Sequence, residues 1–321
     1  MIIRNRLFLA VMLLIIIFYI NCLNRESQRI RILVTPQSVV ASFWVTVKAG
    51  ADSAGKELGV DVIWKGPPTE ADVDNQISIL EDYINQGVDA IVLAALDNKA
   101  LIPIVKRAVS RNIPMILIDS GIDSDDPASF IATDNVLGAN MAARMLAELI
   151  GFRGKVALIP FFPGTSTSIH REKGFKDEIA KYPGIELVTV QYSQNDMAIA
   201  MAVTENILTA FPDIDGIFAA NEPGAIGASQ AILARGLAGK VKIVGFDAAP
   251  NEIDALKKNI IQALIVQNPF KMGYLGVKYA VDVIHGKKIP ERVDTGVTVV
   301  TNENLYNDEI QKLLYPTGRS E

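Results

Sequence analysis

Short apolar runs alternate with amphipathic stretches along the chain from residue 31 onward. The apolar runs are continuous, which is typical of parallel strands covered on both faces. We predict strands at Ile32–Thr35, Asp89–Ala94, Met115–Ile118, Val156–Pro160, Leu187–Gln191, Gly216–Ala219, Lys242–Phe246 and Ala263–Val266. The helical period predicts helices at Phe43–Leu58, Asp72–Gln86, Leu101–Arg111, Asn135–Ile150, Ser168–Lys181, Met197–Ala210, Ala225–Ala234 and Lys271–Ile284. Repeated strand–helix–strand units predict an α/β, doubly wound architecture with parallel sheets.

Two segments share one internal order and have nearly the same length. Asp89–Asp119 and Asp215–Asp247 each contain an opening Asp, an apolar strand, a polar turn, a helix and a second strand that ends in Asp. This repeat predicts two similar lobes, the first centred before residue 132 and the second after it. Ligands of open parallel sheets bind beyond the carboxyl ends of the strands. Asp119 and Asp247 are therefore expected to face one crevice, one from each lobe.

Planar polar side chains follow several of the predicted strands at this same end. They are Asp119, Asn221, Asp247 and Gln267. Such groups can form paired hydrogen bonds with neighbouring hydroxyls. Aromatic rings accompany them, because Phe43 and Trp44 begin the first helix and Phe246 precedes the second Asp. Each residue alone also fits a structural role, since Phe246 could be core and Asn221 could cap a helix. Together they predict a site for a polyhydroxylated small molecule.

Composition and motifs favour binding over catalysis. The chain has 321 residues, half of them hydrophobic, and a net charge of −5 without a basic stripe, which argues against a nucleic-acid partner. His170 and His285 are far apart, and no GxSxG, GxGxxG or GxxxxGK[ST] motif occurs. The acidic cluster Asp123, Asp125 and Asp126 lacks the spacing of a calcium loop. We expect no catalysis, no cofactor and no metal, with an α/β enzyme as the remote alternative.

The first residues have the pattern of an export segment. Arg4 and Arg6 precede an uncharged apolar run of 14 residues, Leu7–Ile20. This run is short for a spanning helix but right for a secretory signal. The only cysteine, Cys22, follows it and makes the segment resemble a bacterial lipoprotein signal. We expect residues 1–22 to direct export to the periplasm or the outer face of the membrane. Lipidation at Cys22 and an uncleaved membrane anchor are the two alternatives.

Seven short segments resemble the periplasmic sugar-binding proteins of ABC transporters, specifically the ribose-binding-like group of the type I periplasmic-binding fold. They are SFW at 42–44, ILIDS at 116–120, ATDNVLGA at 132–139, GTSTSIHREKGF at 164–175, FAANE at 218–222, VGFDAAP at 244–250 and LIVQNP at 264–269. The resemblance implies two lobes, 30–132 plus 268–294 and 133–267 plus 295–313. It also implies a three-strand hinge near Thr133, Gln267 and Thr295, about which the lobes close around a ligand.

The resemblance also implies a set of sugar-binding residues. Carried over by position, they are Phe43, Trp44, Asp119, Ser120, Arg171, Asn195, Asn221, Phe246, Asp247 and Gln267, with Gln37 as a further candidate. In this picture Phe43 or Trp44 and Phe246 sandwich the sugar ring, and Arg171 is a bidentate donor from the second lobe. Ser120 replaces an arginine common in ribose binders, and Asn195 stands where a ring is frequent. A sugar, a sugar alcohol or an inositol therefore remains open.

These expectations lead to one function and one alternative. The first is an exported, monomeric solute-binding protein that captures a small sugar or polyol and delivers it to an ABC permease. The alternative is a sensing module that presents the sugar to a chemoreceptor or histidine kinase. Regulators of the LacI type share the fold but need an N-terminal helix-turn-helix, and an apolar signal stands in its place.

Overall fold

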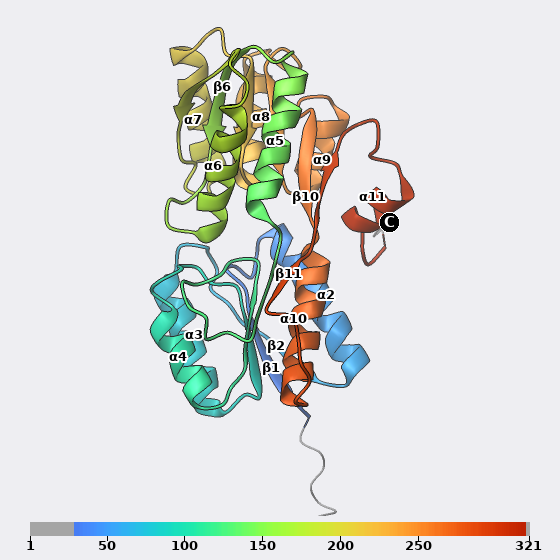
Figure 1. Cartoon of the computed structure of the whole chain (residues 1–321). Coiled ribbons are helices and arrows are strands. Elements are labelled where there is room, and N and C mark those ends of the chain that lie inside the picture. Colours follow the sequence, from blue (N-terminus) through green and yellow to red (C-terminus); the bar gives the residue numbers. More distant parts are fainter. Residues whose placement is uncertain (1–28, 319–321) are drawn as a thin grey trace, which may run out of the picture.

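A computed structural model describes residues 29–318, which form two α/β lobes one above the other (Figure 1). The predicted export segment, with Cys22 in it, lies outside the described residues. All eight predicted strands and all eight predicted helices occur, with ends that differ by a few residues. Among the described residues, no helix combines the length and the apolar character needed to span a membrane.

The first lobe, the lower one in Figure 1, has a parallel six-stranded sheet. Its strand order is β11 (Arg292–Asp294), β5 (Ser129–Ala132), β4 (Met115–Ile118), β3 (Ala90–Leu93), β1 (Arg31–Thr35) and β2 (Asp61–Trp64). One face packs against α2 (Ser42–Leu58) and α10 (Pro269–Ile284). The other packs against α3 (Val73–Gln86) and α4 (Ile102–Ser110). Apolar side chains cover both faces, as the continuous apolar runs require.

The second lobe repeats this plan with one antiparallel edge strand. Its strand order is β12 (Val297–Val300), β10 (Ala263–Gln267), β9 (Lys242–Phe246), β8 (Gly216–Ala219), β6 (Gly154–Ile159) and β7 (Ile185–Val190), and β12 is the antiparallel member. Helices α5 (Asn135–Leu149) and α6 (Ser166–Ile179) cover one face. The other face packs against α7 (Met197–Ala210), α8 (Glu222–Ala234), α9 (Pro250–Lys257) and α11 (Asp308–Leu314). The predicted fold class, two doubly wound lobes of the type I periplasmic-binding fold, is confirmed.

The internal repeat corresponds to β3–α4–β4 in one lobe and β8–α8–β9 in the other. The Asp at the start of each repeat makes the same kind of hydrogen bond. Asp89 Oδ2 accepts a hydrogen bond of 2.7 Å from the N–H of Arg31, and Asp215 Oδ2 accepts one of 2.7 Å from the N–H of Lys155. Each carboxylate thus satisfies a backbone donor at the start of the neighbouring strand.

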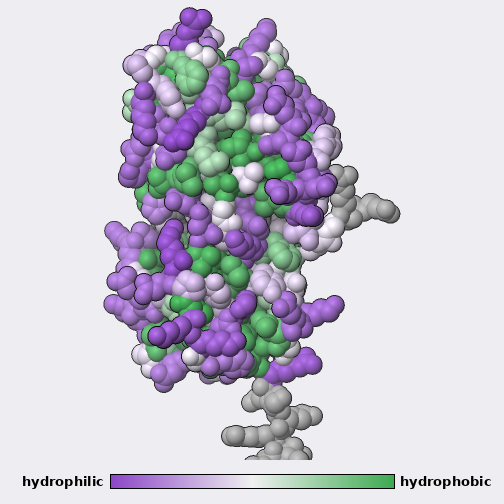
Figure 2. Space-filling model, turned by 45° about the vertical axis from the view of Figure 1, so that its right-hand side comes forward, coloured by the Kyte–Doolittle hydropathy of each residue, from purple (hydrophilic) through white to green (hydrophobic). Residues whose placement is uncertain are grey.

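The chain passes between the lobes three times, after β5, after β10 and after β11. At these crossings Thr133 and Thr295 lie side by side, with their hydroxyl oxygens 3.3 Å apart. Figure 2 shows hydrophilic side chains over the outer parts of the molecule and hydrophobic ones on both sides of the junction between the lobes. The two lobes are thus joined by three crossings of the chain.

Candidate functional site

A cavity of about 90 Å³ lies between the lobes at the carboxyl ends of both sheets. Its lining comes from both lobes and consists of Gln37, Ala41, Phe43, Trp44, Glu70, Asp119, Phe161, Thr167, Arg171, Asn195, Asn221, Glu222, Pro223, Asp247 and Gln267. Eight of the ten predicted site residues are in this set, and so is Gln37. The polar members follow parallel strands or begin the helices after them, where ligands of such sheets bind.

Two predicted site residues, Ser120 and Phe246, lie outside the lining. The Ser120 hydroxyl is buried and is 3.0 Å from the Ser166 hydroxyl of the other lobe, so it joins the lobes. Phe246 ends β9 with its side chain on the α5 face of the sheet and is 0% exposed. The predicted sandwich with Phe246 is therefore not what the structure shows. The second lobe instead places Phe161, which follows β6, in the cavity wall.

Arg171 is held rigidly at the back of the cavity by α6. Its Nε donates to Asn135 Oδ1 (2.7 Å), and its Nη1 donates to the Ala220 carbonyl (2.8 Å). The guanidinium lies over the Phe246 ring, 3.7 Å from the centroid, which is a cation–π geometry. The carboxylate of Asp247 is 3.9 Å away, and the side chain of Arg171 is buried. Phe246 therefore supports the arginine that faces the cavity.

Asp119 and Asp247 occupy equivalent positions directly after β4 and β9. Both have positive φ angles, 57° and 88°, in the left-handed region that Asp and Asn tolerate better than most residues. The turn away from the strand brings each carboxylate to the cavity. Asp247 Oδ1 accepts a hydrogen bond from Gln267 Nε2 at 2.7 Å. Residues held in sparsely populated backbone conformations cluster at functional sites.

Asn195 and Asn221 form a linked pair of amides in the second lobe. Asn221 Nδ2 donates to Asn195 Oδ1 at 2.6 Å, while Asn221 Oδ1 caps α8 by accepting from the N–H of Gly224 at 3.1 Å. Asn221 therefore both caps α8 and lines the cavity. Asn195 Nδ2 donates across to Glu70 of the first lobe at 3.0 Å.

Two carboxylates of the lining, Glu70 and Glu222, were not among the predicted residues. Glu70, in the loop after β2, accepts from Trp44 Nε1 at 2.8 Å as well as from Asn195. Glu222 begins α8 and accepts from the Ser42 hydroxyl of the first lobe at 2.5 Å. Glu222 directly follows Asn221, so its place after a strand was a usable signal. Glu70 lies in the polar segment PPTEAD, where no strand end or period marks it.

The cavity lining contains more acidic than basic side chains. Four carboxyl groups line it, from Glu70, Asp119, Glu222 and Asp247, against the single guanidinium of Arg171. Burial raises the pKa of Asp119 to about 7, with the charge of Arg171 opposing the rise. Burial also raises the pKa of each of the other three carboxyls. Within residues 29–318 no cluster of His, Cys, Asp and Glu has the arrangement of a metal site.

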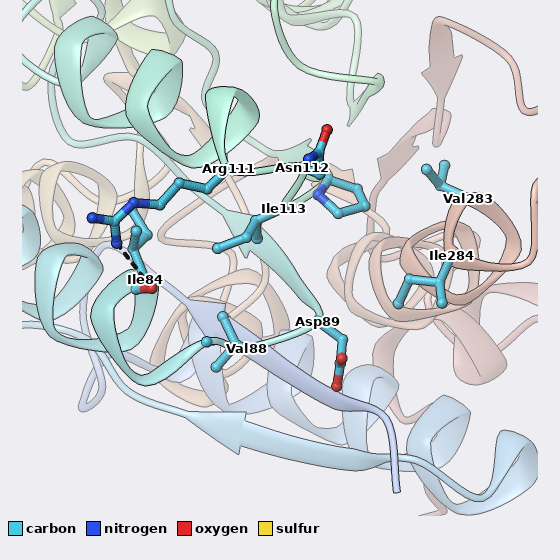
Figure 3. A pocket seen from close by; sticks show the side chains of 10 residues that line it. Ile84, Val88, Asp89, Arg111, Asn112, Ile113, Val283 and Ile284 are labelled. Atoms are coloured by element: carbon cyan, nitrogen blue, oxygen red, sulfur yellow. Dashed lines mark hydrogen bonds between the residues drawn. The ribbon is translucent and has the colours of Figure 1, made fainter. Parts of the chain in front are cut away.

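A second cavity, of about 580 Å³, lies in the first lobe at the amino ends of β3 and β4 (Figure 3). Its lining includes the start of the β3 segment, Val88 and Asp89, and the end of α10. Arg111 donates to the Ile84 carbonyl at 3.4 Å, and Asp89 is engaged with the Arg31 backbone. No predicted site residue lies there, and these charged groups serve the fold. The cavity between the lobes is the better candidate for a ligand.

Comparisons with known proteins agree with this arrangement. Residues 32–288 match the model of the periplasmic binding protein domain. The chain is 32% identical over 261 residues to the ribose import binding protein of Bacillus subtilis, covering 81% of this chain and 84% of that protein. It is 33% identical over 257 residues to the D-allose-binding periplasmic protein of Escherichia coli, covering 77% and 83%. A carbohydrate transporter solute binding protein from Agrobacterium radiobacter, solved with D-arabinose, is 38% identical with a TM-score of 0.87, covering 89% of this chain and 99% of that one.

Proposed function

The chain belongs to the periplasmic binding protein family, and from this premise we propose that it captures a small sugar or polyol between its lobes and delivers it to an ABC permease. It is a solute-binding protein and not an enzyme, and it acts outside the cytoplasm. The observation that carries the proposal is the cavity at the carboxyl ends of both sheets, with polar and aromatic side chains from both lobes.

The size and chemistry of the cavity suit a single small ring. At roughly 10–15 Å³ for each water-sized group, 90 Å³ holds about six to nine such groups. We assign Phe43 and Trp44 of one lobe and Phe161 of the other to the apolar faces of the ring. Asp119, Arg171, Asn195, Asn221, Asp247 and Gln267 are assigned to its hydroxyl groups. A site built to bond hydroxyls discriminates among stereoisomers, because a missing partner leaves a buried polar group unpaired.

The N-terminal segment is assigned to export and attachment. We propose that Cys22 is lipidated after cleavage of the preceding residues, with an uncleaved anchor as the alternative, and that the protein acts as a monomer. Mass spectrometry of the membrane-bound protein distinguishes the two forms. A wild-type protein that is cut elsewhere and released from the membrane contradicts both.

The proposed function is tested by a thermal-shift screen against aldoses, ketoses, alditols, inositols and their amino derivatives, followed by calorimetry. We expect at least one compound to raise the melting temperature and to bind with one-to-one stoichiometry. Asp247→Asn should weaken that binding about tenfold or more, because hydrogen bonds to charged groups contribute about 1.5–3 kcal/mol. The matched control is Asp125→Asn, on an exposed turn. A panel with no binder, or equal loss in both variants, contradicts the proposal.

A further inference from the structure

We infer, on the basis of the proposed function, that the solute carries a protonated amine beside its hydroxyl groups, as an amino sugar or an aminated polyol does. The inference narrows the ligand class of the same cavity. It follows from the charges that line the cavity, from its unused hydrogen-bonding groups and from its aromatic walls.

The charge balance of the lining is the first observation. Its four carboxyl groups come from four separate segments: the loop after β2, the ends of β4 and β9, and the start of α8. Arg171 is the only basic residue among the lining residues of this cavity. It lies 3.9 Å from Asp247, which leaves Glu70, Asp119 and Glu222 without a cationic partner in the wall. Burial favours the neutral form of these carboxyl groups, and a cationic group of the ligand would offset this by favouring their ionised form.

The hydrogen-bonding groups point the same way. Protein acceptors engage the single side-chain N–H of Trp44 and one N–H of each amide group of Asn195, Asn221 and Gln267. By contrast, Gln267 Oε1 is a buried acceptor that has no partner among the described residues, and Gln267 is only 2% exposed. Within residues 29–318, the Asp119 carboxyl likewise accepts no hydrogen bond from another residue. Gln267 Oε1 and the Asp119 carboxyl oxygens are therefore acceptors that donors of a ligand can use.

An ammonium group suits both the acidic lining and the free acceptors better than a hydroxyl does. It brings three donors and one positive charge, whereas a hydroxyl brings one donor and no charge. A desolvated cavity strengthens the attraction between an ammonium and carboxylates. The wall also contains the rings of Trp44 and Phe161, and aromatic rings attract cations. A metal ion is the weaker alternative, because the described residues contain no metal-type cluster.

The test compares ligands that differ in one group. Calorimetry of the full chain at pH 7 uses amino sugars with the amine at carbon 2, 3 or 6 and amino-inositols, each beside its parent alcohol and its N-acetyl derivative. We expect at least one amine to bind at least tenfold more tightly than both of its neutral counterparts. Neutral compounds that bind as tightly as their amines, in every set that binds, overturn this inference and leave the proposed function standing. Binding by no compound of any kind overturns both.

Isosteric variants test whether the carboxylates are the cause. Glu70→Gln, Asp119→Asn and Glu222→Gln each remove a charge and keep an acceptor oxygen. At least one should lower the preference for the amine over its parent alcohol about tenfold, while affinity for the parent changes less than threefold. The control Glu81→Gln removes an exposed charge of α3 that pairs with Arg107. An unchanged preference in all three cavity variants overturns the assignment.

Discussion

Three polar residues of the cavity wall hold a backbone conformation that most L-amino acids avoid. Asp119, Asn195 and Asp247 have φ angles of 57°, 55° and 88°. Only short polar side chains and glycine adopt this region readily. At Asp119 and Asp247 the conformation turns the chain at a strand end, so that the side chain reaches the cavity. Asp→Asn changes are therefore the cleanest probes of these positions, because Asn keeps both the backbone and the shape.

We expect Asp119 to make the ligand-free protein less stable as the pH rises. Burial raises the pKa of Asp119 from the ordinary 3.8 to about 7; Asp247 and Glu70 act in the same direction and Arg171 opposes them. The stability contributed by the neutral carboxyl is fully present below pH 3.8 and is lost as the pH rises through about 7. Melting temperatures at pH 5 and pH 8 should therefore differ less in Asp119→Asn than in the wild type. If the melting temperature changes equally between pH 5 and pH 8 in both proteins, Asp119 is not the source of the pH dependence.

The sequence could reveal cavity residues that follow a recognisable strand, such as Asp119 and Asp247. It could not reveal Glu70, because a polar loop carries no periodic signal and its position depends on how β2 and α3 pack. The expectation that the Phe246 ring lines the cavity failed for a different reason. Side chains of a strand alternate between its faces, and Phe246 lies on the α5 face beneath Arg171. Sequence proximity to Asp247 therefore did not imply a shared direction.

Among the elements, strands that form a continuous apolar run were predictable, and strands without such a run were not. Strand β3 is buried at all four positions, and the apolar run that marks it is unambiguous. Strand β11 has only three residues, RVD, and β5 has four. Neither is a continuous apolar run, and β11 is defined by its pairing with β5, a strand far away in the chain. Such elements depend on the tertiary fold, which a local pattern does not contain.

Helix α2, which carries Phe43 and Trp44, packs closely against α10. A methyl group added at Gly273 would lie 1.9 Å from the Val47 carbonyl oxygen, so the two backbones are in direct contact. We expect Gly273→Ala to destabilise the protein by about 1–3 kcal/mol, the usual cost of overpacking. Calorimetric melting measures this. Gly164→Ala is the control, since its methyl group would meet only the Asp97 carboxylate, at 3.8 Å. Equal melting temperatures for the two variants contradict the expected contact.

At the scale of the whole molecule, cavity residues also hold the lobes together. The hydrogen bonds from Asn195 to Glu70 and from Ser42 to Glu222 cross between the lobes, as does the contact of Ser120 with Ser166. The doubly wound architecture was predictable because the same strand–helix–strand unit recurs. These contacts were not, because they join residues brought together only when the lobes meet.

Removing one contact between the lobes should speed release of the solute. We expect Ser166→Ala to raise the dissociation rate roughly 2- to 12-fold, since a hydrogen bond contributes about 0.5–1.5 kcal/mol to the closed form. Stopped-flow fluorescence measures the rate. Ser110→Ala, on the exposed side of α4, is the control because its hydroxyl bonds only within its own helix. A dissociation rate unchanged from the wild type contradicts a role for Ser166 in closure.

The most direct test of sugar binding between the lobes uses the two tryptophans of the chain as reporters. Both tryptophans belong to or pack against the core of the first lobe, but Trp44 lines the cavity and Trp64 does not. Intrinsic fluorescence is titrated with the sugar identified by calorimetry, in Trp64→Phe and in Trp44→Phe. We predict a saturable change in Trp64→Phe, at the concentration that calorimetry gives, and the loss of most of it in Trp44→Phe. A full signal in Trp44→Phe with none in Trp64→Phe would place the sugar elsewhere and contradict the account.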